Sequence, residues 1–125
     1  MLAWHVSVYR QNDGGSSPAG LKTPEGARLA VWQCSFDGLE WVEELAKAGH
    51  AVDLGGNGYP RRYTAPAKHI IPRIEVKPPL AYDVWLLGAG DIVTDKWAGK
   101  TVIDHAVIQN CSPDEWLIIQ AWDES

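Results

Sequence analysis

The chain has 125 residues, of which 46 % are hydrophobic and 22 % charged, and its formal net charge is −5. This length suits one compact domain, and the composition can fill a core, which argues against a disordered or collagen-like chain. The acidic balance also argues against a generally basic nucleic-acid-binding protein. We therefore expect a single domain over residues 1–125.

The first nine residues contain neither a basic segment nor a long apolar segment, so no targeting signal is predicted. The longest apolar runs, such as 117–119, are far shorter than the roughly 20 residues that span a bilayer. We expect a cytoplasmic protein that does not enter a membrane. Because two cysteines are too few for a disulfide framework, Cys34 and Cys111 are predicted to be small buried side chains. A disulfide between them is the alternative if the chain is exported.

Two strands and a long loop are predicted at the start of the chain. Residues 3–10 alternate between apolar and polar side chains, with Val6 and Val8 on one face. Turn-forming residues dominate 11–26, which predicts a loop. The apolar segment 27–34 predicts a second, more buried strand. A loop of this length is either mobile or functional.

A helix is predicted over residues 38–48. Asp37 is its expected N-cap, and Glu40 three residues later completes a capping-box pattern. Gly49 is expected to end the helix in the left-handed conformation. The apolar side chains recur at spacings of three and four residues, at Leu39, Val42, Leu45 and Ala46.

A short strand is predicted over 50–54, and the glycine-rich stretch 55–58 predicts a tight turn. The segment 59–79 is expected to be extended and to lie at a sheet edge or on the surface, with no helix longer than about one turn. This expectation depends on prolines that recur every six residues, at Pro60, Pro66, Pro72 and Pro78.

Three more elements are predicted in the second half of the chain. Residues 82–87 read as a strand, and 101–110 as a helix capped by Thr101. The short run 116–122 is rich in β-formers and is predicted to be a buried strand, with a helix as the alternative. Together these elements predict an α+β fold: a mostly antiparallel sheet of five to six strands with the two helices, about 38–48 and 101–110, packed on one face.

No pattern in the sequence identifies a reaction. The histidines have no metal-ligand spacing, and no nucleophile motif surrounds either cysteine. We therefore predict no catalytic residue, no metal and no cofactor. The alternative is a small enzyme whose cleft is assembled from distant polar residues: His50, Asp53, His69 and His105.

Tryptophan is unusually abundant, with seven residues against one phenylalanine. Most lie in predicted strands, where bulky aromatic side chains build the core. Trp41 and Trp97 are the better candidates for a ligand groove. A third hypothesis follows from the same abundance, namely a homo-oligomer that buries a tryptophan-rich surface between subunits.

Positive charge is concentrated in one part of the acidic chain. Residues 61–77 carry a net charge of +4, whereas residues 83–125 carry −6. A glycine turn exposes backbone N–H groups, and guanidinium groups can bind a carboxylate or phosphate. The residues 53–73, together with the Trp97 loop, therefore form the predicted binding site, whose members are Asn57, Tyr59, Arg61, Arg62, Tyr63, His69, Arg73 and Trp97.

The hypothesis favoured by these patterns is a non-catalytic binding module. Its 53–73 region would recognise an acidic small molecule or the acidic surface of a protein partner. Adjacent residues of an extended segment point apart, so at most one of Arg61 and Arg62 is expected to enter a given site. Single-stranded nucleic acid, bound by the aromatic and basic residues of this region, is a minor option that the overall negative charge opposes.

Overall fold

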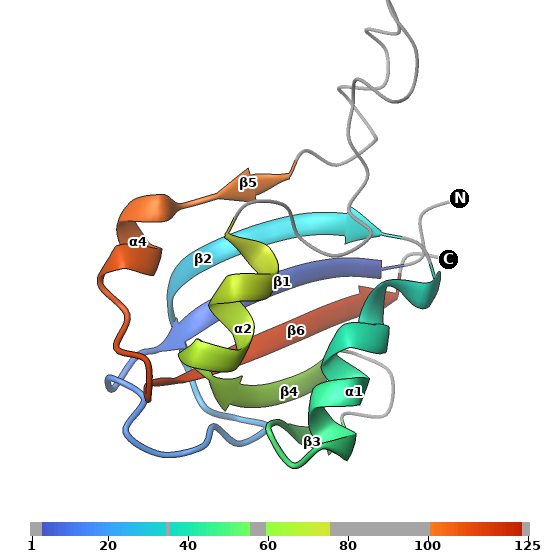
Figure 1. Cartoon of the computed structure of the whole chain (residues 1–125), viewed down its shortest axis with the longest axis horizontal. Helices are drawn as coiled ribbons and strands as arrows, with labels where there is room; N and C mark the ends of the chain where they lie inside the picture. Colours follow the sequence, from blue (N-terminus) through green and yellow to red (C-terminus); the bar gives the residue numbers. More distant parts are fainter. Residues whose placement is uncertain (1–3, 35, 56–59, 76–100, 124–125) are drawn as a thin grey trace, which may run out of the picture.

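A single antiparallel sheet organises the chain in the computed structural model, which describes residues 4–34, 36–55, 60–75 and 101–123. Its six strands lie in the order β3-β4-β6-β1-β2-β5 (Figure 1). Each neighbouring pair is antiparallel. With helices on one side of this sheet, the described residues have the predicted α+β fold.

The two strands predicted at the start of the chain are confirmed, with slightly different ends. β1 spans Trp4–Gln11 and β2 spans Glu25–Cys34, and the two pair over most of their length. Val6 and Val8 belong to the hydrophobic core, as their alternation predicts. The residues between these strands form the loop 12–24.

β6, Trp116–Asp123, is confirmed as a strand and lies between β1 and β4, so the alternative of a helix is wrong. Its apolar side chains from Leu117 to Ile119 are completely buried on both faces of the sheet. This burial explains why the segment reads as a nearly continuous apolar run rather than as an alternating one.

The first predicted helix forms, but it begins differently. A 3-10 turn, η1 (Phe36–Leu39), leads into α1 (Glu40–Lys47), and the N-cap residue Leu39 makes no side-chain cap bond. Asp37 is therefore not the cap of α1. The end is as predicted, since Gly49 has a φ of +83° and its N–H donates to the Ala46 carbonyl.

The prediction for 59–79 is wrong in two respects. β3 (Val52–Gly55) is the edge strand, and β4 (Arg61–Pro66) lies inside the sheet between β3 and β6. An eight-residue helix, α2 (Ala67–Ile74), follows β4 directly and contains Pro72. Residues 76–79 lie outside the described part of the chain.

Packing and distant hydrogen bonds explain why α2 forms despite Pro72. The first two N–H groups of the helix donate to the carbonyls of Glu115 and Pro113, at 2.7 and 2.9 Å. Ile70 and Ile74 are completely buried, and each contributes roughly 1.5–3 kcal/mol. A proline inside a helix costs about 3 kcal/mol, so the burial of the two isoleucines offsets it.

The helix predicted over 101–110 is shorter than expected. Val102–Ile103 form the short strand β5 beside β2, and α4 spans only His105–Gln109. Asp104 is its N-cap and accepts a hydrogen bond from the Val107 N–H at 3.1 Å, so Thr101 does not cap it. Two β-branched residues thus complete the sheet, and the helix begins after them.

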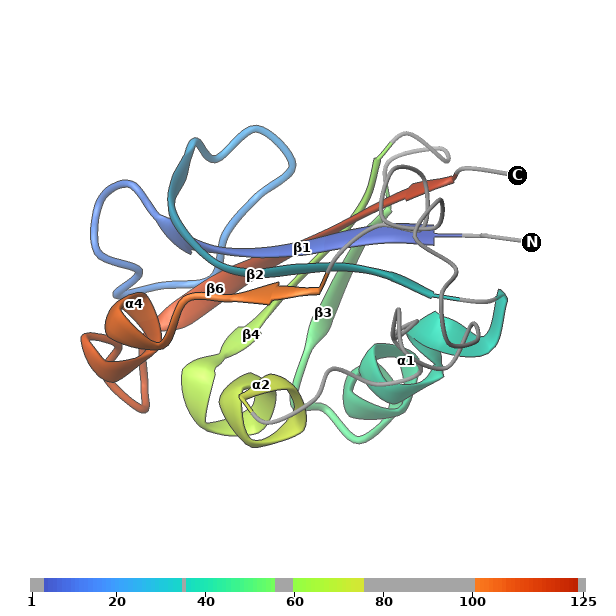
Figure 2. The same cartoon turned by 90° about the horizontal axis from the view of Figure 1, so that it is seen from above.

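The two faces of the sheet are covered differently (Figure 2). The helices α1, α2 and α4 lie on one side, which we call the helix face, and the core is packed beneath them. The loop 12–24 lies on the opposite side, the loop face. The predicted strand 82–87 and the site residues Asn57, Tyr59 and Trp97 lie outside the described residues.

Candidate functional site

The two adjacent arginines of β4 point to opposite faces of the sheet, as strand alternation requires. Arg61 lies on the helix face, 3.5 Å from Glu43 and 3.4 Å from Asp53, and its guanidinium is 5.4 Å from the centre of the Tyr63 ring. Arg62 lies on the loop face, where its side chain is only 6 % exposed. The two guanidinium groups therefore belong to different sites.

Arg62 connects the sheet to the loop 12–24. Its Nη1 donates to the Gly20 carbonyl at 2.8 Å and also to the Leu21 carbonyl. Its Nη2 lies 3.3 Å from the carboxylate of Glu25 at the start of β2. A buried guanidinium thus holds the loop against β4.

A second contact, two residues further along β4, holds the same loop against the sheet. The hydroxyl of Thr64 accepts a hydrogen bond from the Ala19 N–H at 3.1 Å and donates to the Leu117 carbonyl at 2.8 Å. Thr64 is completely buried by these contacts. The loop is therefore packed on the sheet rather than extended into solvent.

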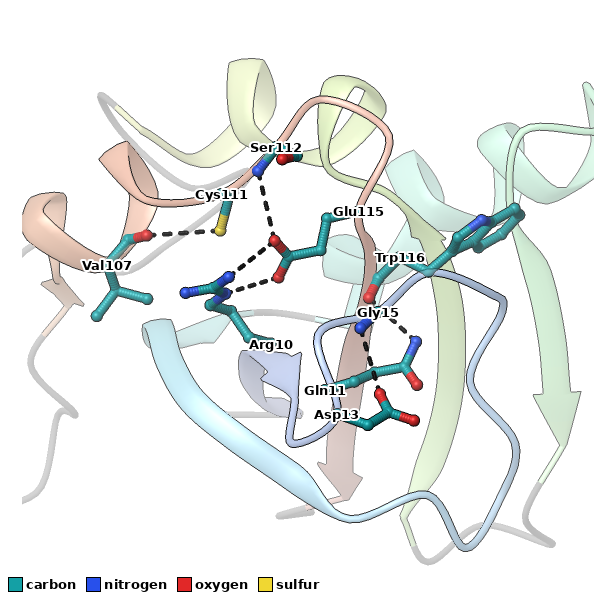
Figure 3. Close-up of polar contacts among 9 residues, drawn as sticks. All are labelled: Arg10, Gln11, Asp13, Gly15, Val107, Cys111, Ser112, Glu115 and Trp116. Atoms are coloured by element: carbon teal, nitrogen blue, oxygen red, sulfur yellow. Dashed lines mark hydrogen bonds and ion pairs between the residues drawn. The ribbon is translucent and has the colours of Figure 1, made fainter.

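The beginning of the loop is fixed at Trp116, the first residue of β6 (Figure 3). The Gly15 carbonyl accepts a hydrogen bond from the Trp116 N–H at 2.8 Å, and the Gln11 side chain donates to the Trp116 carbonyl at 3.1 Å. Gly15 has a φ of +72°, and a Cβ there would lie 2.7 Å from the Trp116 carbonyl oxygen. Only glycine fits this close approach.

An ion pair lies beside this junction (Figure 3). Arg10 binds the buried Glu115 carboxylate through two hydrogen bonds, of 2.6 and 3.0 Å. The half-buried Cys111 thiol donates to the Val107 carbonyl at 3.5 Å, and burial and Glu115 raise its pKa. Burial also raises the pKa of Cys34 to about 11. Both cysteines are free, and at neutral pH both are protonated rather than nucleophilic thiolates.

Between the loop and the sheet lies a pocket of about 370 Å³ on the loop face, which we call the loop-face pocket. This volume is within the usual range for small-molecule sites. Four large apolar side chains are exposed among the described residues, and two of them, Leu21 (52 %) and Trp122 (46 %), line this pocket. The complete lining consists of Leu21, Lys22, Glu25, Pro60, Arg62, Gln120 and Trp122.

The charged side chains that line the loop-face pocket differ in whether they already have a partner of opposite charge. Glu25 receives a hydrogen bond from the Gln120 side chain, which is the main reason why its pKa is lowered, and Arg62 adds to this effect. Glu25 is therefore ionised at neutral pH. Arg62 is neutralised by Glu25, whereas Lys22 has no acidic partner among the described residues. Lys22 is thus the lining cation that is available to a ligand.

The helix face has a smaller hollow, of about 310 Å³, that contains part of the predicted site. It is lined by Glu43, Asp53 and Tyr63 among others, and Arg61 already pairs with both carboxylates. Burial raises the pKa of Tyr63 to about 12, so its phenol stays protonated. The two carboxylates of this hollow are thus satisfied within the protein, whereas Lys47, which also lines it, has no ion-pair partner among the described residues.

The remaining polar candidates are dispersed. The His50 and His69 rings stack with their centres 4.2 Å apart, whereas Asp53 pairs with Arg61. His105 begins α4, at the opposite end of the sheet from β3 (Figure 1). Within the described residues, no group of three or more metal-ligating side chains comes together. Arg73 is exposed on α2.

Trp41 and Trp122 differ in exposure from what the sequence predicted. Trp41, a candidate for a ligand groove, is only 5 % exposed, and the centre of its ring lies 6.3 Å from that of the completely buried Trp32. Trp122, which was expected to build the core, is exposed at the loop-face pocket. The alternation of Ile118, Gln120 and Trp122 in β6 is the signal that places Trp122 on the same face as a polar residue.

No protein-family model, no curated protein and no solved structure is significantly similar to this chain. None of the helices in the described ranges is both long and apolar enough to cross a bilayer. The class of molecule is therefore defined by its own geometry: a small α+β domain with a ligand-sized pocket between its sheet and the loop 12–24.

Proposed function

We propose that the protein is a non-catalytic binding module that takes a small carboxylate-bearing molecule into the loop-face pocket. The observation that carries this proposal is the convergence of Leu21 and Trp122, two exposed apolar side chains, on a pocket that also holds Lys22, a cation with no acidic partner in the described part of the chain. An exposed tryptophan beside a free cation offers a flat apolar surface and a charge for one ligand.

The ligand chemistry follows from the lining. Lys22 favours an anionic group, and a carboxylate satisfies its ammonium through charge-assisted hydrogen bonds. The indole of Trp122 favours a flat apolar group that can stack on it. A pocket of about 370 Å³ suits a small molecule better than the broad surface of a protein, which usually needs about 800 Å² from each partner.

The proposal keeps the acidic small molecule expected from the sequence but changes the residues that bind it. From the segment 53–73, Pro60 and Arg62 line the pocket, and Arg62 acts by holding the loop. Cytoplasmic location is part of the same proposal, because the free thiols of Cys34 and Cys111 suit a reducing compartment.

The experiment is an NMR titration of the ¹⁵N-labelled protein with indole-3-acetate, which combines a flat ring with a carboxylate. The uncharged indole-3-acetamide is the matched control. We expect saturable shifts of the Trp122 indole N–H and the Gln120 amide, with a millimolar Kd, as is usual for such a small probe. The acetamide should bind about fivefold more weakly, since a partly exposed ion pair contributes up to about 1 kcal/mol.

Two lysine variants test whether the pocket itself is responsible. Lys22→Gln should remove the preference for the acetate, whereas Lys47→Gln, on the helix face, should leave it unchanged. The proposal is wrong if neither probe shifts the Trp122 signal, or if the two variants weaken binding equally.

A further inference from the structure

Glu25, the acidic residue of the loop-face pocket, affects which carboxylate-bearing ligands this pocket can bind. Glu25 lines the same pocket as Lys22, which lies three residues earlier in the chain. The Glu25 side chain is 42 % exposed. No ion pair between the two side chains is present in the described structure. Lys22 is therefore available to a ligand, and Glu25, whose charge is balanced by Arg62, remains accessible as a hydrogen-bond acceptor.

The Glu25 carboxylate is held in one orientation by its two neighbours. The Gln120 amide and the Arg62 guanidinium both contact Oε1, and the backbone N–H of Glu25 is a further donor to the carboxylate. No described side chain bonds Oε2. A carboxylate that is ionised and fixed by one oxygen presents the other as a pre-organised acceptor. It favours a ligand that carries a hydrogen-bond donor, and a positively charged donor most of all.

A ligand with only a negative charge meets Lys22 favourably but leaves the exposed part of the Glu25 carboxylate without a donor. A ligand with only a positive charge can donate to Glu25 but leaves Lys22 without an acceptor. A zwitterion satisfies both groups, because its ammonium and carboxylate can lie against opposite charges at once.

We propose that the natural ligand class is an α-amino acid or similar zwitterion with a flat apolar side chain, its ammonium bound by Glu25, its carboxylate by Lys22 and its side chain by Trp122. This inference rests on the proposed function, since it adds the ammonium to a carboxylate site. It identifies Glu25 as the residue that determines specificity among carboxylates.

Three related probes separate the contributions of the two charges. Tryptophan carries both charges, N-acetyltryptophan lacks the ammonium, and tryptophanamide lacks the carboxylate. Their dissociation constants are measured from the NMR shifts of the protein's Trp122 and Gln120 signals. We expect tryptophan to bind about fivefold more tightly than either derivative, as expected for the loss of one partly exposed ion pair.

A matched pair of protein variants then assigns the effect. Glu25→Gln should lower the affinity for tryptophan to that of N-acetyltryptophan, without weakening N-acetyltryptophan itself. Glu44→Gln removes an exposed carboxylate on the helix face and should change neither affinity. Circular dichroism spectra of both variants establish that they are folded.

The outcomes distinguish the inference from the function on which it rests. If N-acetyltryptophan binds as tightly as tryptophan, Glu25 does not recognise an ammonium; the inference is wrong and the carboxylate site stands. If tryptophanamide binds as tightly as tryptophan, Lys22 does not recognise the carboxylate, and the proposed function is wrong together with the inference. If neither indole-3-acetate nor N-acetyltryptophan shifts the Trp122 signal, both proposals fail.

Discussion

Arg62 and Arg61 provide an internal comparison, because they are neighbours on β4 whose side chains meet different environments. We consider the replacement of each by methionine, which keeps much of the aliphatic side chain and removes the guanidinium. Arg62→Met removes the hydrogen bonds to the Gly20 and Leu21 carbonyls and the contact with Glu25. Arg61→Met removes two ion pairs on the helix face.

The two losses differ in magnitude. A hydrogen bond from a charged group contributes about 1.5–3 kcal/mol, and both Arg62 bonds to the loop are partly buried. Water can replace part of this loss at the Glu25 carboxylate, which is 42 % exposed. We therefore expect Arg62→Met to cost about 3 kcal/mol. Arg61 contacts carboxylates that are 43 % and 46 % exposed, so Arg61→Met should cost less than about 1 kcal/mol.

Urea unfolding followed by circular dichroism measures both values, and thermal unfolding provides a second estimate. For a domain of this size, a loss of 3 kcal/mol lowers the Tm by about 10 °C. Arg62→Met should also increase amide hydrogen exchange across residues 19–22, because these residues lose their connection to β4. If Arg61→Met is as destabilising as Arg62→Met, or if the loop exchanges no faster in Arg62→Met, our account of the loop's attachment is wrong.

Three further changes test other contacts. Gly15→Ala places a Cβ against the Trp116 carbonyl at a positive φ and should cost about 3 kcal/mol in urea unfolding; a neutral result would contradict the close approach. Thr64→Val removes two buried hydrogen bonds and should cost about 2 kcal/mol, with faster exchange in the covering loop, whereas Thr64→Ser should retain most of the stability. Burial and the stacked His50 lower the pKa of His69 below 6.5, so its contribution to stability is present above pH 6.5 and is lost as the pH falls through its folded-state pKa. His50→Gln should raise the pKa of His69 in an NMR titration, and an unchanged pKa would mean that the stacked ring has no influence.

Elements defined by their own periodicity could be predicted from the sequence. The stripe of apolar residues in 38–48 and the β-forming run 116–122 specify α1 and β6 locally. The helix α2 could not be predicted in this way, because the carbonyls that bind its first N–H groups come from residues 113 and 115, more than 40 residues further along the chain. The regular proline spacing was the stronger local signal, and tertiary packing overrides it.

At the candidate site, too, the face on which a strand residue lies could be predicted from the sequence, whereas contacts between distant segments could not. Alternation in β4 predicts that Arg61 and Arg62 diverge, and alternation in β6 puts Gln120 and Trp122 on one face. The sequence does not show that Arg62 reaches carbonyls some 40 residues earlier in the chain, and the same is true of the contact between Gln120 and Glu25. The excess of positive charge in 61–77 therefore indicated a free cationic surface, whereas the structure pairs Arg61, Arg62 and Lys68 with acids.

The position of β6 has a consequence for how the chain assembles. β1 pairs with β2 and β3 pairs with β4, and among the described strands the two pairs are joined only by β6, which follows all of them in chain order. Before residues 116–123 have been synthesised, neither pair has the strand that joins it to the other, and each leaves the edge that β6 will occupy unpaired. The final strand closes both edges at once, so cooperative folding must wait for residues 116–123, and until then the nascent chain is open to mispairing with its neighbours.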